Sequence, residues 1–234
     1  MTGSSRGLGR ATAIELGRRG WRVCVNFRRN AAAAAETVHA ILGCEAADAF
    51  AFEADVCSRA AVGDMFAECI RRWGAIDLLV NNAGIARASL LPNMTEPEWD
   101  EVIGVDFTGA LNCCREAARL MMQTGRGHII NISSIAGLRG RAGQSHYAAA
   151  KGALAGLSRQ LAAELGPAGV RVNAVLPGYL PTDMGLASPD AARQAAEEHC
   201  LGRLGDVDET ARFIADLAEM QSVTGQVLRV DGRI

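Results

Sequence analysis

Strand-like and helix-like runs alternate along nearly the whole chain, and this alternation restricts its fold more than any other feature. Short β-branched or apolar runs, typical of buried strands, occupy residues 21–27, 49–55, 75–80, 127–133, 169–175 and 226–230. Amphipathic or alanine-rich runs, typical of helices, occupy residues 10–20, 31–42, 59–74, 96–122 and 145–165. Such alternation predicts an α/β protein in which helices flank a parallel, doubly wound sheet. No linker or repeat divides the chain, so we expect one domain over residues 1–234.

The chain opens on a glycine-rich turn that leads into the first helical run. Gly3, Gly7 and Gly9 form a TGxxxGxG pattern. Glycines let a tight turn aim backbone N–H groups at a pyrophosphate beside the positive end of the next helix, as in a Rossmann-type dinucleotide site. An ordinary glycine-rich loop is the alternative. A strand normally precedes the turn, but only Met1 precedes Thr2. We therefore expect the first strand to be missing from the chain, leaving two inner sheet edges without partners.

Tyr147 and Lys151 lie four residues apart in the helical run over residues 145–165. This spacing places both side chains on one face of a helix. An ammonium group favours the phenolate, so we expect the pKa of Tyr147 to fall toward the working pH and the phenol to exchange protons with a substrate. On spacing alone, the pair is more often a simple surface contact.

Further motifs follow the strand-like runs in a fixed order. Asn81 to Gly84 read NNAG after one run, Ser134 ends another, and Pro177 and Gly178 follow a third. Together with the glycine turn and the Tyr-x-x-x-Lys spacing, they closely resemble the short-chain dehydrogenase/reductase family over essentially the whole chain. The resemblance implies a single Rossmann-type domain that binds a dinucleotide and reduces a carbonyl group to a hydroxyl.

The resemblance implies catalytic roles for four residues. Ser134 would hydrogen-bond the substrate carbonyl, Tyr147 would donate the proton, and Lys151 would bind the nicotinamide ribose and lower the pKa of Tyr147. Hydride arriving at a carbonyl carbon leaves negative charge on the oxygen, which such donors stabilise. At the fourth position relatives carry Asn, whereas this chain has Asp106. Its charge could pair with Lys151 and alter the pH dependence; alternatively, Asp106 is a packed polar residue without a catalytic role.

The same resemblance implies NADP(H) as the cofactor. NAD enzymes of this type carry an acid after the second strand, whereas residues 26–29 read NFRR. Arg6 and Arg28 could instead hold a 2′-phosphate, unless they are merely solvated. The expected cofactor-binding residues are Gly3, Ser5, Arg6, Gly7, Leu8, Gly9, Arg28, Asp55, Val56, Asn82, Ala83, Gly84, Tyr147, Lys151, Pro177, Gly178, Leu180 and Thr182.

The stretches NNAGIARASLL, SHYAAAKGAL, PGYLPTDM and GRLG look most like the 3-oxoacyl-[acyl-carrier-protein] reductases of this family. The likeness implies reduction of a 3-oxoacyl thioester in fatty acid synthesis, with the acyl group on acyl carrier protein or coenzyme A. Relatives hold the acidic carrier with basic residues where this chain has Gly125 and Ala168, although Arg126 and Arg171 are close. Two alternatives remain open. One is a reductase of another small ketone, sugar or polyol, and the other is a non-catalytic nucleotide-binding relative.

Residues 180–204 form a candidate substrate lid.

The composition limits the classes of molecule that we expect the protein to bind and the compartment in which we expect it. The net charge of −2 favours neither nucleic acid nor a membrane surface, and no apolar run is long enough to span a membrane. Seven scattered cysteines indicate reduced thiols in a cytoplasmic protein, and nothing suggests a metal site. The runs over residues 96–122 and 145–165 carry more small and apolar residues than one sheet face should bury, so we expect a homotetramer built on a four-helix contact.

Overall fold

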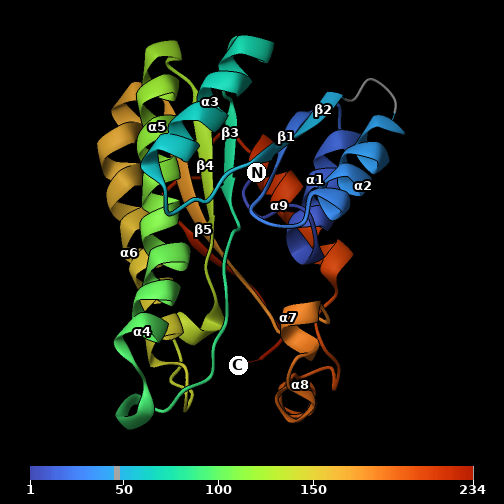
Figure 1. Cartoon of the computed structure of the whole chain (residues 1–234), viewed down its shortest axis with the longest axis vertical. Coiled ribbons are helices and arrows are strands. Elements are labelled where there is room, and N and C mark those ends of the chain that lie inside the picture. Colours follow the sequence, from blue (N-terminus) through green and yellow to red (C-terminus); the bar gives the residue numbers. More distant parts are fainter. Residues whose placement is uncertain (45–47, 234) are drawn as a thin grey trace.

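The strands form a parallel α/β architecture (Figure 1). The computed structural model describes residues 1–44 and 48–233. Its strands are β1 (Arg22–Phe27), β2 (Asp48–Glu53), β3 (Leu78–Asn81), β4 (Gly127–Ile132), β5 (Val170–Pro177) and β6 (Val227–Val230). β1 pairs with β2, and β3, β4, β5 and β6 pair in that order, all in parallel. The predicted strands are confirmed, with ends that differ by at most three residues.

Helices cover both faces of the strands (Figure 1). They are α1 (Gly7–Arg18), α2 (Ala31–Leu42), α3 (Arg59–Trp73), α4 (Glu96–Ile103), α5 (Gly109–Thr124), α6 (Ser145–Leu165), α7 (Asp183–Leu186), α8 (Pro189–Glu197) and α9 (Val207–Glu219). α3, α5 and α6 lie on one face and α1, α2 and α9 on the other, which confirms the doubly wound prediction. The run over residues 96–122 is instead divided into α4 and α5 by a π-helix, η2 (Gly104–Thr108). None of the helices in the described ranges is both long and apolar enough to cross a membrane.

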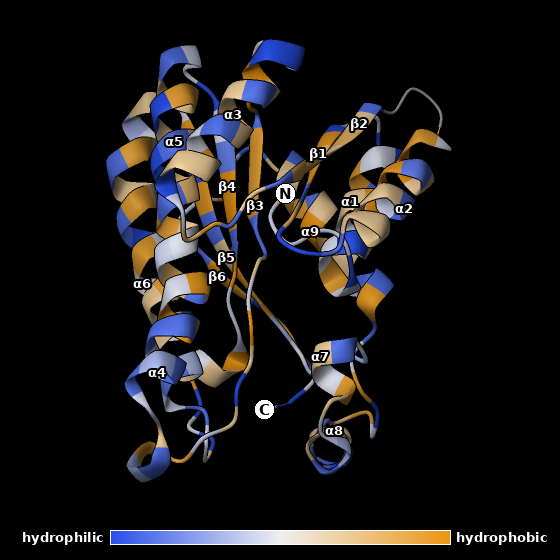
Figure 2. Ribbon diagram, viewed as in Figure 1, coloured by the Kyte–Doolittle hydropathy of each residue, from blue (hydrophilic) through white to orange (hydrophobic). Residues whose placement is uncertain are grey.

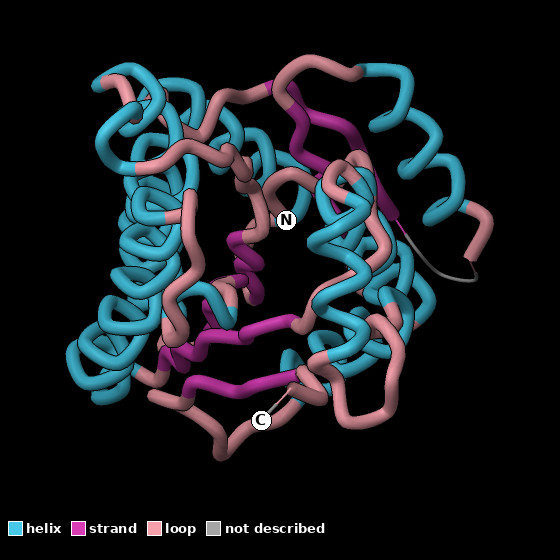
Figure 3. Tube along the Cα trace, turned by 90° about the horizontal axis from the view of Figure 1, so that it is seen from below, coloured by secondary structure: helices cyan, strands magenta, loops and turns pink. Residues whose placement is uncertain are grey.

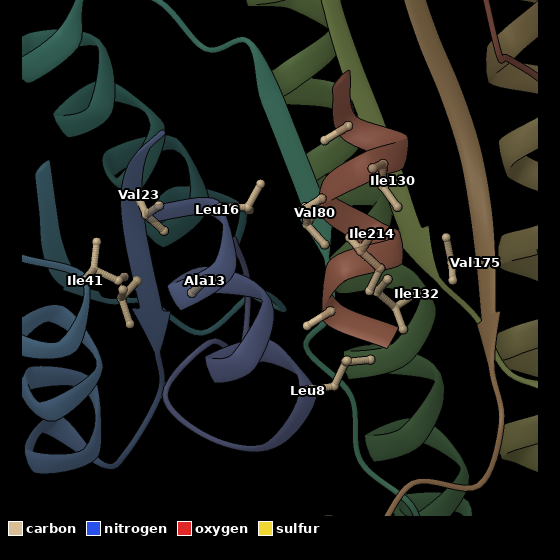
Figure 4. Close-up of a cluster of buried hydrophobic side chains, with 14 of the residues drawn as sticks. Leu8, Ala13, Leu16, Val23, Ile41, Val80, Ile130, Ile132, Val175 and Ile214 are labelled. Carbon is tan, nitrogen blue, oxygen red and sulfur yellow. The ribbon is translucent and has the colours of Figure 1, made fainter. Parts of the chain in front are cut away.

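The strands and the helices that cover them carry many apolar residues (Figure 2), and two clusters of buried apolar side chains fill the space between these layers. On one face, Leu16 of α1 and Ile214 of α9 belong to one buried cluster with Val80, Ile130 and Val175 of the strands (Figure 4). A second buried cluster joins α3, α5 and α6 to the opposite face. Burying a side chain of this size contributes about 1.5–3 kcal/mol. Because both faces are covered, the strands are apolar along most of their length.

The sheet is interrupted between β1 and β3, where the sequence analysis expects a missing strand (Figure 3). Met1–Ser4 enters this gap at its carboxyl end. The amino group of Met1 donates to the Cys24 carbonyl at 3.0 Å, and the Thr2 N–H donates to the Val80 carbonyl at 3.0 Å. The rest of the gap is a cavity of about 320 Å³ lined by β1, β3 and α3. Among the described residues, the backbone groups of β1 and β3 that face it have no strand partner.

An added strand is expected to fill this cavity. Extending the chain before Met1 with about six alternating Val and Ile residues, a usual strand length, should raise the melting temperature. The new strand would form hydrogen bonds with the backbone groups of β1 and β3 that face the gap, and it would bury apolar surface. An extension of the same length made of Gly and Ser is the control. Equal melting temperatures of the two proteins by calorimetry would contradict this interpretation of the gap.

Candidate active site

The predicted site residues meet at the carboxyl ends of the parallel strands. The NNAG segment extends from the end of β3, Ser134 follows β4, and residues 177–178 lie at the end of β5. α6 brings Tyr147 and Lys151 to the same edge, and α7 and α8 lie across it from α4 (Figure 1). In open α/β sheets, ligands bind in the crevice outside this edge.

Close backbone contacts fix α6 against the segment after β4. The Ser133 hydroxyl donates to the Lys151 carbonyl at 2.6 Å. A Cβ on Gly137 would lie 2.7 Å from the backbone nitrogen of Gly152, so only glycine allows this approach. The sequence analysis missed this contact. Its signals were the glycine in SSIAG and the glycine directly after Lys151.

Ser134, Tyr147 and Lys151, the residues expected to carry the chemistry, are neighbours. The Ser134 side chain lies beside the Tyr147 phenol and favours its ionised form, and the Ser134 oxygen accepts from the Ala136 N–H at 3.2 Å. Lys151 Nζ lies 5.6 Å from the centre of the Tyr147 ring and donates to the Ile132 carbonyl at 3.1 Å. Two hydroxyl donors beside an ammonium group can stabilise negative charge on a carbonyl oxygen.

Asp106 and Lys151 form a buried ion pair. Asp106 lies in the π-helix η2, a local distortion that is frequent at functional sites. Its Oδ1 lies 3.0 Å from Lys151 Nζ, and its Oδ2 accepts from the Ile85 N–H at 2.9 Å. The Nζ–Oδ1 contact is an ion pair without a well-directed hydrogen bond. The two side chains are 0% and 4% exposed, so each charge depends on the other.

The pKa of Tyr147 is shifted in the direction opposite to the one expected. Burial raises the pKa of the phenol, and the Asp106 carboxylate adds to this rise, whereas Lys151 and Ser134 oppose it without outweighing it. Burial also disfavours the Lys151 ammonium, but Asp106 and Tyr147 outweigh that effect and raise the pKa of Lys151. Lys151 lowers the pKa of Tyr147 as expected, but the expectation that this pKa falls overall is wrong, because helical spacing shows neither the depth of burial nor the second charge.

The glycine turn packs directly on the NNAG segment. The Asn82 side chain donates to the carbonyls of Thr2 and Gly3, and the Thr2 hydroxyl accepts from the N–H groups of Asn82 and Ala83. A Cβ on Gly3, which has a φ of +59°, would lie 2.8 Å from the Ala83 Cα. A Cβ on Gly9 would collide with the Gly3 carbonyl. Glycine is therefore required at both positions, and Thr2 is a supporting residue that the sequence analysis missed.

The start of α1 presents backbone N–H groups to the site. α1 begins at Gly7, and within the described chain no side chain caps it and no acid occupies its first turn. An uncapped helix N-terminus favours a phosphate group. The Ser5 carbonyl accepts from the Thr37 hydroxyl, which fixes the turn, whereas the Leu8 side chain is buried in the core. Leu8 can therefore contribute only its backbone to a ligand.

Both arginines expected to hold a 2′-phosphate lie next to carboxylates. Arg6 Nη1 is 3.6 Å from Asp183 of α7, and Arg28 Nε is 3.2 Å from Asp55, itself an expected cofactor residue. All four side chains are exposed or half-buried, so each pair contributes at most about 1 kcal/mol. A phosphate group can therefore compete with the carboxylate for either guanidinium.

The remaining expected cofactor residues line the site in different ways. The side chains of Val56, Pro177 and Leu180 are buried, so they shape the walls more than they contact a ligand. The Gly178 N–H donates to β6, which holds the end of β5 in place. Thr182 is the N-cap of α7, at the start of the candidate lid.

The candidate lid over residues 180–204 includes α7 and α8. Arg141, in the segment after β4, donates to Gln194 of α8 at 3.4 Å and so connects the two sides of the site. His146, which directly precedes Tyr147, is fully buried. Its Nδ1 accepts from the Tyr147 N–H at 2.9 Å.

The chain is similar to known proteins over nearly its whole length. The family profile described as short chain dehydrogenase matches residues 1–193. A 3-oxoacyl-[acyl-carrier-protein] reductase from Staphylococcus epidermidis is 38% identical over 235 residues, covering 99% of this chain and 96% of the relative. A 3-oxoacyl-[acyl-carrier-protein] reductase from Synechocystis sp. is also 38% identical, covering 99% and 94%. The crystal structure of levodione reductase matches with a TM-score of 0.93 at 31% identity, covering 99% and 94%.

The protein therefore belongs to the short-chain dehydrogenase/reductase family of oxidoreductases, whose members use a nicotinamide cofactor.

Gly84, one of the expected cofactor-binding residues, also packs against the buried ion pair. A Cβ at this position would lie 2.7 Å from Asp106 Oδ1 and 3.3 Å from Lys151 Nζ. Any side chain here would therefore have to displace one of the two charged groups.

Gly84→Ala is expected to destabilise the protein by about 1–3 kcal/mol, because the added methyl group overpacks the ion pair. Gly63→Ala in α3 is the control, since a Cβ there meets nothing within 4 Å. The control should stabilise the protein by about 0.5–1 kcal/mol, as alanine does within a helix. Urea denaturation measures both variants, and equal stabilities of Gly84→Ala and wild type would contradict the tight packing.

Proposed function

We propose that the protein is an NADPH-dependent reductase of 3-oxoacyl thioesters. The observation that carries the proposal is the grouping of Ser134, Tyr147 and Lys151 at the carboxyl edge of the sheet, with Lys151 Nζ 5.6 Å from the centre of the Tyr147 ring. The 38% identity to 3-oxoacyl-[acyl-carrier-protein] reductases over nearly the whole chain supports the acyl substrate. We extend the proposal to a cytoplasmic role in fatty acid synthesis and to a single catalytic domain over residues 1–234.

The residues of the glycine turn fit a dinucleotide. The backbone of residues 3–9 and the uncapped start of α1 would hold the pyrophosphate. Arg6 and Arg28 would hold the 2′-phosphate of NADPH by exchanging their exposed carboxylate partners for it. Lys151 would bind the nicotinamide ribose. When bound, NADPH supplies the hydride that reduces the carbonyl carbon.

The side chains of this protein would supply the proton and the charge stabilisation. Ser134 and Tyr147 would donate hydrogen bonds to the carbonyl oxygen, where negative charge develops. Tyr147 would then transfer its proton to that oxygen, and the Lys151 ammonium would stabilise the phenolate that remains. Because the pKa of Tyr147 is raised, the phenol is protonated at neutral pH and can act as the acid.

The proposed substrate is a thioester of either acyl carrier protein or coenzyme A. Arg126 precedes β4 and Arg171 lies at the start of β5, whereas Ser134 follows the far end of β4. A strand of this length spans roughly 20 Å, so these arginines lie at the edge of the sheet opposite the site. Thioesters of acyl carrier protein and of coenzyme A should therefore be assayed side by side.

We also propose a homotetramer, in which α5 and α6 pack against their symmetry mates. Met122 near the end of α5 is 49% exposed, which fits a helix with apolar surface left to cover. An interface with two-fold symmetry would bury the same surface of both subunits.

A panel of 3-oxoacyl thioesters, levodione and simple ketones tests the proposed substrate. We expect the highest kcat/KM for the thioesters. Tyr147→Phe should lower kcat about 100- to 10,000-fold while the Kd for NADPH, measured by nicotinamide fluorescence, stays close to that of wild type. A preference for levodione or simple ketones would contradict the substrate, and full turnover by Tyr147→Phe would contradict the role of the phenol. Failure to bind NADPH would favour a non-catalytic relative.

Arg28→Asp is expected to shift the cofactor preference toward NADH. The substitution removes a phosphate partner and introduces an acid that can bind ribose hydroxyls. Arg212→Asp on the exposed surface of α9 is the control for the change in net charge. The ratio of kcat/KM with NADPH to that with NADH is the readout. A wild-type protein that already prefers NADH would refute the assignment.

A further inference from the structure

The ion pair between Asp106 and Lys151 stands beside the group that transfers the proton in the proposed reaction. Asp106 is fully buried and lies 3.0 Å from Lys151 Nζ, which in turn lies 5.6 Å from the centre of the Tyr147 ring. Within the described chain, the other direct partner of the carboxylate is the Ile85 N–H. The charge of Asp106 is thus compensated mainly by one ammonium group.

We propose that Asp106 is a positioning residue that sets the pH range of the reaction, by holding the Lys151 ammonium and keeping the Tyr147 phenol protonated up to a higher pH. The inference rests on the proposed carbonyl reduction. In that reaction the O–H bond of Tyr147 breaks as the O–H bond of the product forms, and the phenolate regains its proton from water. In alcohol oxidation the phenolate accepts the hydroxyl proton, so this direction needs the ionised form.

The net charge of the buried group explains the effect. With Asp106 and Lys151 ionised and Tyr147 neutral, the group carries no net charge, and ionising Tyr147 creates a buried negative charge. With a neutral side chain at position 106, the group starts with a positive charge that ionising Tyr147 would cancel. A buried net charge is unfavourable, so the phenolate forms at higher pH in the wild-type protein. The raised pKa values of Tyr147 and Lys151 agree with this direction.

Apart from Lys151, the titratable groups around Asp106 do not compensate the negative charge of its carboxylate. η2 packs against α4, α5 and α6, and a Cβ on Gly104 would lie 3.6 Å from Cys57 Sγ in the segment after β2. Among the residues that the structure describes, the titratable groups near the carboxylate are Tyr147 and Lys151 of α6 and Cys57 after β2. Burial raises the pKa of Cys57 to about 11, and Asp106 adds to that rise, so this thiol stays neutral. Ion pairs of α4 and α5 in the described chain lie at the surface.

Asp106→Asn tests the proposal through the pH dependence of alcohol oxidation with NADP⁺. The rising limb of the rate should move to lower pH by about one unit or more, since a nearby like charge no longer opposes the phenolate. Asp100→Asn on the exposed side of α4 removes an acid elsewhere and should leave the limb in place. The proposal is overturned if the rising limb of the rate in Asp106→Asn stays at the wild-type pH or moves to higher pH.

A titration of the tyrosines tests the proposed effect of Asp106 on the pKa of Tyr147 without any substrate. The chain has two tyrosines, Tyr147 and Tyr179, so tyrosine labelled with ¹³C at Cζ yields two resonances that Tyr147→Phe assigns. We expect a Tyr147 pKa above the ordinary value of 10.0 in wild type and a lower one in Asp106→Asn. A wild-type value below 10.0, or an equal value in the variant, overturns the proposal even if no thioester is reduced. If Asp106→Asn does not fold, Asp106→Ser, whose side chain is also neutral, takes its place in this titration with the same expected lowering.

Discussion

A buried carboxylate persists in this fold only while an ammonium group neutralises it, and the arrangement of the site follows from that requirement. Asp106 comes from η2, Lys151 from α6, and Gly84 from the segment after β3, so the pair joins three segments that are distant in sequence. Removing one partner of such a pair costs about 3–5 kcal/mol. The apolar clusters supply most of the stability, but the geometry at the carboxyl edge depends on this pair.

The two halves of the site rest on different physical interactions. On the side proposed to bind the cofactor, Arg6 and Arg28 form exposed ion pairs that water already weakens, so a phosphate can replace the carboxylates at little cost. On the side proposed to carry the chemistry, Lys151 has a partner that no solvent reaches. In the proposed reaction the first half would exchange partners on binding, whereas the second would keep its charges in place.

Local patterns predicted the elements well, whereas contacts between distant segments stayed hidden. The strands and the helix over residues 145–165 depend on side-chain period, which the sequence displays. The resemblance also suggested that Asp106 pairs with Lys151, and the structure contains that pair. The π-helix, the approach of Gly137 to α6 and the net direction of the Tyr147 pKa depend on packing and burial, which spacing does not show.

The pKa of Lys151 tests most directly whether the buried pair organises the site. Lys151 is the only lysine in the chain, so lysine labelled with ¹³C at Cε gives one resonance that needs no assignment. A buried lysine without a partner has a lowered pKa, whereas one that faces a carboxylate can have a raised pKa. The account predicts a pKa above the ordinary 10.5 in the wild-type protein. A value below 10.5 would show that Asp106 does not hold the ammonium, and would contradict the account.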